Sequence, residues 1–347
     1  MKVLIVRIGA MGDVLHTMPA VAALRQKHPD WFIGWAIEPR WSDLLQMAGD
    51  YDDMSQAVGR FASHALVDRW YSVTTGAWKV KPFSRRTHRE MGVLRDVLRR
   101  EQFDLCVDMQ GSLKSAVVAR MAKASVLVGA DKPRERVARM FYKHKVETTA
   151  AHVVEQGCEL LGEAVGETLR PVPVTLPMDE MDERWADEMV GREPFCLISP
   201  GGGWGSKIWP AERFGRVAAE LGRAGIRSVV NTAPRGSAEA DRCVAASAGF
   251  ARAAPGTVGQ LVALTRRAAV VVASDTGPLH LAAALERPVV AIFGPTDPAR
   301  NGPYGTHSRV LRSAGSVTSY KRLIEAEDGL LRIEVEDVAA AALELLG

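Results

Sequence analysis

Residues 275–280 bring together an acid, a hydroxyl, a glycine, a proline and a histidine, the residue types of an anion-binding loop. The apolar run 270–273 precedes them and a helical pattern follows from Leu281, so the loop should join the end of a buried strand to a helix. Pro278 suits the first turn of that helix. A helix start offers unpaired N–H groups and a positive partial charge, and both favour a bound phosphate.

The side chains of this loop have two interpretations. His280 is close enough to the helix start to add a donor or a positive charge to a phosphate, whereas Asp275 is expected to orient the loop rather than contact the anion. The alternative is an ordinary strand-to-helix turn in which Thr276 caps the helix. Because α/β proteins contain many such turns, the local sequence leaves both interpretations open.

A second candidate anion-binding loop, residues 200–209, follows the apolar run 195–199. It is not a Walker A loop, because Ser206 rather than a glycine directly precedes Lys207, and Ile208 rather than Ser or Thr directly follows it. Its small residues would let the backbone approach a diphosphate, and Lys207 would offset the charge. A solvent-exposed loop with a surface lysine is the alternative. Two such loops at the carboxyl ends of strands in one sheet favour a phosphorylated ligand there.

Asp13 is the candidate catalytic residue of the first half of the chain. It follows the expected strand 3–6 and a loop with two glycines, at the edge where open parallel sheets bind ligands. Asp is also a favoured helix N-cap, which is the structural alternative. Pro19 indicates either that the helix proper begins near Thr17 or that its first turns are kinked. The loop lacks the G-x-G-x-x-G fingerprint of dinucleotide folds, which disfavours an NAD enzyme.

A basic and aromatic segment, residues 69–100, interrupts the regular pattern. Most charge runs are solvated faces, and that is one interpretation. The other is a cationic acceptor platform that also contacts an anionic membrane surface.

Strands and helices alternate along the chain in two arrays, and an extended segment with alternate prolines separates them. This pattern predicts an α/β protein of two doubly wound, Rossmann-like domains that face a cleft. The final helix can cross back to the first domain. The expected parts are an acceptor-binding domain at 1–168, a linker at 169–178, a nucleotide-sugar-binding domain at 179–325 and a C-terminal helix at 326–347.

Composition narrows the function classes. The 347 residues carry a net charge of +3, which is no nucleic-acid signature but permits an anionic partner. The four cysteines form no C-x-x-C pair, so we expect buried free thiols in a reducing compartment. The sequence starts with a strand-length run rather than a signal peptide, and no apolar stretch is long enough to span a bilayer. We therefore expect a cytoplasmic protein.

Four segments together resemble the bacterial lipopolysaccharide heptosyltransferases, and the likeness covers nearly the whole chain in order. Residues 108–115 and 141–142 look most similar to heptosyltransferase I, which adds the first core heptose. The four segments are residues 11–19, 207–210, 275–280 and 293–298.

The resemblance implies a GT-B fold and an inverting, metal-independent glycosyltransferase without a cofactor. The implied reaction moves heptose from ADP-L-glycero-D-manno-heptose to Kdo of Kdo2-lipid A, at the inner face of the cytoplasmic membrane and in peripheral contact with it. By position, Asp13 matches the general base of the family and Lys207 its diphosphate lysine. The donor-binding motif is matched by Asp275, Thr276, Gly277 and His280.

Other positions match the family less closely. Glu239 is a loose match, by its spacing, to the acid of the family that contacts the ribose. Arg69 and Lys114 are candidate acceptor contacts. Gly202 and Gly203 stand where the first enzyme of the pathway often has hydroxyl residues. Backbone N–H groups could replace those hydroxyls. A different activated sugar as the donor, or the addition of a later heptose, remains an alternative function.

Three competing functions differ in ways that the sequence or a simple assay addresses. A sugar-nucleotide epimerase of the same architecture would act without an acceptor. A periplasmic sugar-binding protein would need a signal peptide. An NAD oxidoreductase would need the missing glycine fingerprint.

Overall fold

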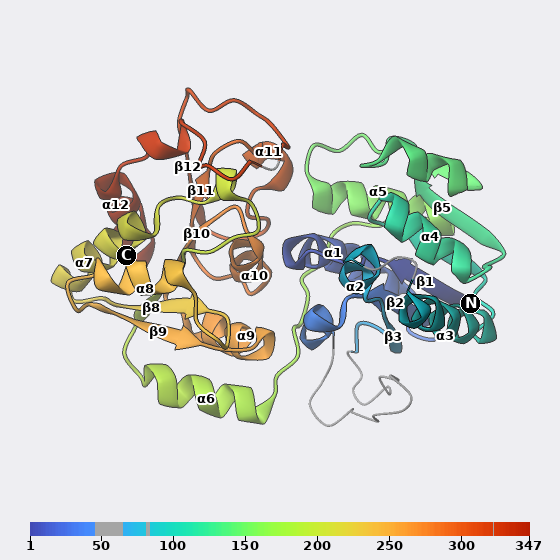
Figure 1. The fold of residues 1–347 in the computed structure, drawn as a ribbon, viewed down its shortest axis with the longest axis horizontal. Coiled ribbons are helices and arrows are strands. Elements are labelled where there is room, and N and C mark those ends of the chain that lie inside the picture. Colours follow the sequence, from blue (N-terminus) through green and yellow to red (C-terminus); the bar gives the residue numbers. More distant parts are fainter. Residues whose placement is uncertain (46–64, 81–83, 322) are drawn as a thin grey trace. The chain divides into compact units, whose positions relative to one another are not determined.

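The chain folds into two compact units, Met1–Pro177 and Met178–Gly347, each with its own six-stranded sheet (Figure 1). Residues 168–179, which include the alternate prolines, form no helix or strand. The predicted α/β class with two doubly wound parallel sheets is confirmed. This computed structural model describes residues 1–45, 65–80, 84–321 and 323–347.

The first unit has the strand order β3-β2-β1-β4-β5-β6, and every neighbouring pair is parallel. Its strands are β1 (Lys2–Val6), β2 (Phe32–Ile37), β3 (Arg69–Ser72), β4 (Leu105–Asp108), β5 (Val126–Ala130) and β6 (His144–Val146). Its helices are α1 (Met11–Lys27), η1 (Pro39–Leu44), α2 (Thr75–Val80), α3 (Arg85–Arg100), α4 (Leu113–Met121), η2 (Arg136–Phe141) and α5 (Val153–Val165). The order reverses between β1 and β4, and this switch point is where open sheets bind ligands.

Helix α1 begins at Met11 and continues through Pro19, so a helix proper that starts near Thr17 is wrong. Pro19 removes one backbone hydrogen bond, but burial of α1 between the sheet and α5 keeps the helix continuous. Ala10 occupies the N-cap position, which places Asp13 inside the first turn. The carboxylate of Asp13 accepts a hydrogen bond from the Ala10 amide at 3.3 Å.

The second unit repeats this plan with the order β12-β11-β10-β7-β8-β9, again parallel throughout. Its strands are β7 (Phe195–Ser199), β8 (Arg227–Thr232), β9 (Ala251–Pro255), β10 (Val270–Ser274), β11 (Val289–Phe293) and β12 (Ser308–Arg312). Its helices are α6 (Glu180–Val190), η3 (Gly205–Lys207), α7 (Ala211–Arg223), α8 (Ala238–Ala245), α9 (Val258–Arg267), α10 (Gly277–Ala284), α11 (Pro298–Asn301), η4 (Leu330–Arg332) and α12 (Val335–Leu346). Here the order reverses between β7 and β10, so the loops after these two strands flank the switch point.

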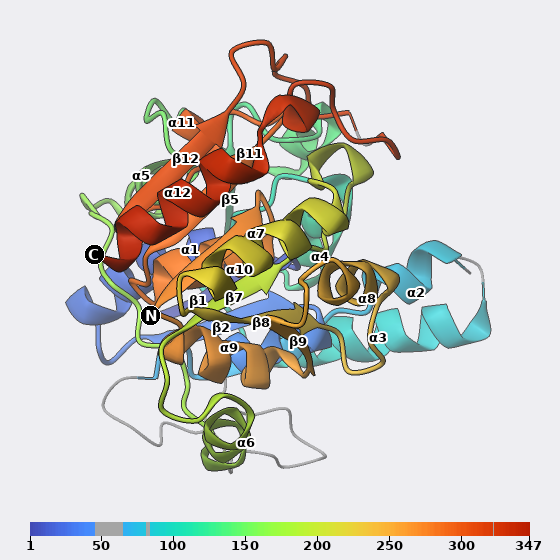
Figure 2. The same ribbon diagram turned by 90° about the vertical axis from the view of Figure 1, so that its left-hand side faces the viewer.

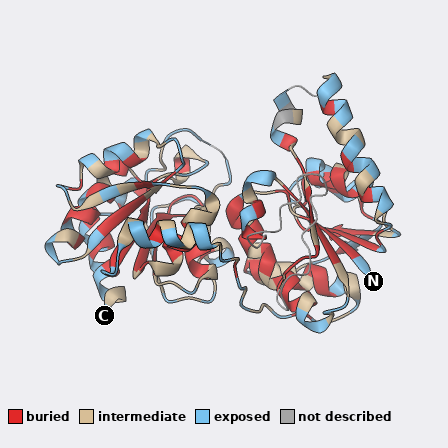
Figure 3. Cartoon of the chain, turned by 90° about the horizontal axis from the view of Figure 1, so that it is seen from below, coloured by how far each residue is buried: buried red, intermediate tan, exposed pale blue. Residues whose placement is uncertain are grey.

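The central strands of both units are buried, while the helices expose their outer faces (Figure 3). Strands β7, β10 and β11 are buried at every position, as expected for parallel strands covered on both sides. No helix within the described residues has both the length and the apolar character needed to cross a bilayer.

The C-terminal helix α12 belongs to the second compact unit. It packs on α7 and on strands β10, β11 and β12 of its own unit (Figure 2). Val338 and Ala342 of α12 are fully buried in the same cluster as Trp209 and Phe214. Burial of this apolar face against the nearby sheet stabilises the packing of α12 on the second unit.

Candidate functional site

The two loops at the switch point of the second unit meet through an ion pair. Lys207 ends η3 after β7, Asp275 follows β10, and Lys207 Nζ lies 2.5 Å from Asp275 Oδ2. The hydroxyl of Thr296 donates to the same oxygen at 2.6 Å, and His280 Nε2 lies 3.1 Å from Oδ1. Asp275 therefore orients its surroundings, as the sequence predicted, by tying three segments to one carboxylate.

Burial raises the pKa of Asp275, but the hydrogen bond from His280 and the charges of His280 and Lys207 outweigh it. The net pKa lies well below the ordinary value of a carboxyl group. The side chain of Trp204 lies beneath Lys207, with Nζ 4.6 Å from the ring centroid. The lysine is thus held at the loop rather than extended into solvent.

The loop 201–203 approaches the start of α10 closely at one glycine. A Cβ added at Gly202 would lie 2.8 Å from the Thr276 methyl carbon, whereas at Gly203 no described atom would lie within 4 Å. Thr276 occupies the N-cap position of α10 but does not cap it, because its hydroxyl donates to the carbonyl of Ser274. In the first turn of α10, Pro278 has no N–H and the Leu279 amide donates to the Thr276 carbonyl at 3.1 Å. The amide of Gly277, at the positive end of the helix dipole, is therefore the backbone donor placed to meet an anion.

Glu239 stands apart from the Lys207–Asp275 cluster. It lies in the first turn of α8, with its carboxylate 3.7 Å from Arg242, which also pairs with Glu212 at 3.1 Å. The structure does not bring it into contact with the other donor-loop candidates. A role at a nucleotide ribose stays a prediction.

Asp13 lies at the switch point of the first unit, and its carboxylate is about one-third exposed. Arg7 Nη2 lies 3.0 Å from Asp13 Oδ1, and Arg134 Nη1 lies 3.9 Å from Oδ2. Arg7 therefore holds one oxygen of this carboxylate, while the Ala10 amide and Arg134 lie near the other. Because the side chain is still partly exposed, it can accept a proton from a bound hydroxyl.

Arg7 was missed in the sequence, although its place directly after the first strand was a usable signal. Its guanidinium also donates to the carbonyl of Met109 in the loop after β4. The indole of Trp35 donates to the backbone carbonyl of Arg7 at 3.0 Å. Arg7 thus connects the two loops of the switch point to Asp13.

A buried network around Asp108 supports the loop after β4. The carboxylate accepts hydrogen bonds from Tyr142 at 2.8 Å and Ser115 at 2.9 Å, and from the backbone amide of Gln110 at 3.0 Å. Burial raises the pKa of Asp108 despite these hydrogen bonds. Gly129 is required here, because a Cβ at this position would lie 2.4 Å from the Tyr142 ring.

Of the two acceptor candidates, Arg69 lies at the edge of the sheet opposite Asp13, while the role of Lys114 stays a prediction. Arg69 begins β3 and pairs with Glu101, a carboxylate that also binds Lys2 at the amino end of β1. The carboxyl end of β1, where Asp13 follows, is the opposite edge of the sheet. Lys114 is exposed in the first turn of α4.

Among the described residues, no three His, Cys, Asp or Glu side chains gather into a group that could hold a metal ion. The cations that pair with Asp275 and Asp13 are Lys207, Arg7 and Arg134. Positive charge for a phosphorylated ligand is therefore available from side chains.

Comparison with known proteins adds independent information. The pattern of glycosyltransferase family 9 (heptosyltransferase) matches residues 91–325. Lipopolysaccharide heptosyltransferase 1 of Escherichia coli K12 is 30% identical to this chain, over 90% of this chain and 94% of that protein. The E. coli heptosyltransferase WaaC with ADP superposes with a TM-score of 0.78 at 26% identity, covering 99% of this chain and 100% of WaaC. WaaC with ADP-2-deoxy-2-fluoro heptose gives a TM-score of 0.75 at 27% identity, covering 99% of each chain.

Proposed function

This chain belongs to glycosyltransferase family 9, the heptosyltransferases, and from that premise we propose the reaction that its two switch points serve. It is a glycosyltransferase that transfers heptose in lipopolysaccharide core biosynthesis. The proposed donor is ADP-L-glycero-D-manno-heptose, and the proposed acceptor is a Kdo hydroxyl of Kdo2-lipid A. The donor diphosphate is assigned to the second unit and the acceptor hydroxyl to the first.

The cluster of Lys207, Asp275, Thr296 and His280 is the observation that carries the donor assignment. When the diphosphate binds, Lys207 exchanges part of its ion pair with Asp275 for the phosphate oxygens. The amide of Gly277 and the positive end of the α10 helix dipole face the same charge. These groups stabilise the negative charge that develops on the leaving ADP, so the chemistry needs no metal ion.

Asp13 is the proposed general base. It takes the proton of the acceptor hydroxyl as that oxygen forms a bond to the anomeric carbon of the donor. The bond from the anomeric carbon to the phosphate oxygen breaks, and ADP leaves with the bonding electrons, which inverts the anomeric configuration. Arg7 keeps the Asp13 carboxylate oriented during the transfer.

The close approach of Gly202 to Thr276 bears on the choice of donor. A larger residue at Gly202 would have to displace Thr276 or Ile208. In this chain, backbone N–H groups of the loop replace the hydroxyl groups that the family's first enzyme often places here. A related donor sugar or a later heptose addition is the second candidate.

Mass spectrometry of the product tests the reaction. Incubation with ADP-heptose and Kdo2-lipid A should add one heptosyl unit to the lipid and release one ADP for each transfer. An incubation without the lipid should leave the donor intact. Conversion of the donor in the absence of acceptor would instead indicate an epimerase. Recovery of the lipid without an added heptose would refute the proposal.

We also propose that the enzyme works at the cytoplasmic face of the inner membrane, in peripheral contact with it. The support for this is the lipid nature of the proposed acceptor.

A further inference from the structure

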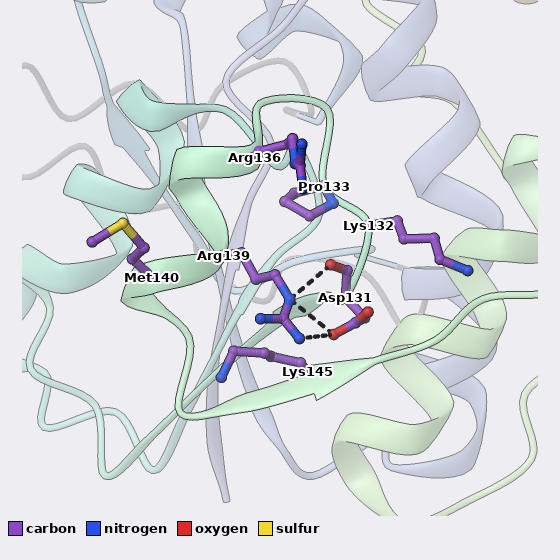
Figure 4. Close-up of a pocket in the computed structure, with 7 residues that line it drawn as sticks. All are labelled: Asp131, Lys132, Pro133, Arg136, Arg139, Met140 and Lys145. Atoms are coloured by element: carbon purple, nitrogen blue, oxygen red, sulfur yellow. Dashed lines mark hydrogen bonds and ion pairs between the residues drawn. The ribbon is translucent and has the colours of Figure 1, made fainter.

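The segment 131–146 of the first unit forms an open pocket of about 750 Å³ that is lined mainly by cations. In Figure 4, Arg139 and Asp131 face each other, with Lys132 and Met140 on either side. The lining residues are Asp131, Lys132, Pro133, Arg136, Arg139, Met140 and Lys145. The pocket suits a ligand with negative charge.

Two of the four cations are already paired. Arg139 Nη2 lies 2.6 Å from Asp131, and Lys132 Nζ lies 2.7 Å from Glu147. The side chains of Arg136 and Lys145 are exposed, and within the part of the chain that the structure describes neither side chain makes an ion pair or a hydrogen bond. Their charges are available to an external anion.

Two apolar side chains project from the same short helix, η2. Met140 is 83% exposed and Val137 is 43% exposed. Their neighbour Ala138 is fully buried and Tyr142 is nearly so, which means that η2 is anchored without Met140. A freely soluble phosphate would gain nothing from these apolar side chains, whereas a bilayer interface would.

The same segment reaches the candidate base. Arg134, two residues before η2, lies 3.9 Å from the Asp13 carboxylate. A bilayer bound at η2 would therefore bring the sugars of a lipid acceptor close to Asp13. This connection between η2 and Asp13 rests on the proposed function.

We propose that η2 docks the enzyme on an anionic phospholipid bilayer. Val137 and Met140 enter the interface, while Arg136 and Lys145 bind the headgroup phosphates. Near an anionic surface each Lys or Arg contributes roughly fivefold in affinity (about 1 kcal/mol). Together these four residues form the η2 surface.

Flotation of the full-length protein with vesicles tests the η2 surface. The wild type should bind vesicles of phosphatidylcholine mixed with phosphatidylglycerol and should not bind phosphatidylcholine alone. The double variant R136S/K145S should bind the anionic vesicles roughly 25-fold more weakly. Met140→Gln should weaken binding on the order of fivefold, because the buried apolar area is lost.

The matched control is R85S/R89S on α3, which removes two exposed arginines from the other basic segment. Because these charges lie outside the η2 surface and act only through screened long-range attraction, the control should change vesicle binding by less than about twofold. An equal loss in the control, or no loss in R136S/K145S and Met140→Gln, would overturn the proposal. Circular dichroism of each variant shows whether it is folded; because all of the substituted side chains are exposed, we expect native spectra.

A soluble-anion site is the competing explanation. Inorganic phosphate would then abolish vesicle binding of the wild type, and Met140→Gln would bind as the wild type does. That result would also overturn the proposal. Because the assay contains neither donor nor acceptor, its outcome is independent of whether the enzyme transfers heptose.

Discussion

Asp275→Asn keeps the size of the side chain and removes the charge at the centre of the donor loops. Asp275 is buried and accepts contacts from Lys207, His280 and Thr296. A hydrogen bond to a charged group contributes about 1 kcal/mol more than a neutral one, and all three partners lose that gain when the Asp275 charge is removed. Lys207 is partly exposed and can turn to water, which limits the loss. We expect the free energy of unfolding of the second unit to fall by about 2 kcal/mol.

The difference between wild type and variant should depend on pH in one direction. The pKa of Asp275 is lowered in the folded protein, so its stabilising contribution is present above the pKa of an unfolded Asp, about 4. The contribution is lost as the pH falls through the folded value. The variant should therefore be less stable by a constant amount near neutral pH, and the gap should narrow below about pH 4.

Differential scanning calorimetry across this pH range measures the effect. A loss of about 2 kcal/mol corresponds to a shift of roughly 4–8 °C in Tm for a unit of this size. Thr296→Val is the matched control, because it removes one hydrogen bond and leaves the charge. Because the acceptor is charged, the loss of this hydrogen bond should cost about 1.5 kcal/mol, and the variant should largely keep the acid dependence of the wild type. Equal melting of Asp275→Asn and wild type at neutral pH, or a gap that widens in acid, would refute the reasoning.

Three further predictions concern turnover. Asp13→Asn should lower kcat by about 10²–10⁴-fold while calorimetry shows unchanged ADP-heptose binding, and retained turnover would remove Asp13 as the base. Arg7→Met should lower kcat with little effect on the donor KM, and Arg7→Lys should recover part of it; an effect confined to KM would contradict the positioning role. Gly202→Ala should raise the donor KM several-fold, because its Cβ would lie 2.8 Å from the Thr276 methyl, and Gly203→Ala should have a smaller effect. Equal KM values for the two alanine variants would argue against close loop packing.

The proposed η2 surface lies outside the segment that the sequence singled out for membrane contact. The basic segment 69–100 attracted attention because its charges are dense. In the structure Arg69 pairs with Glu101, and Arg86 pairs with Glu90. Charge density in a sequence does not show which cations are neutralised by partners elsewhere in the fold.

The sequence by itself determined the fold class and the places of the main loops. Continuous apolar runs specify buried parallel strands, and the residues that follow them must reach the carboxyl edge of a sheet. Asp13, Lys207 and Asp275 could be identified because each lies in the loop or the helix start that follows such a run. The start of α1 at Met11 could not, since Pro19 disfavours a helix there and only packing on the sheet and α5 offsets that preference.

The tertiary structure alone decided which side chains meet. Lys207 and Asp275 are 68 positions apart, and Arg7 reaches Met109 across 102 positions. Thr296 joins Asp275 only because β11 lies beside β10. Such contacts depend on strand order, which local propensity does not encode, and the same long-range packing placed α12 on its own sheet.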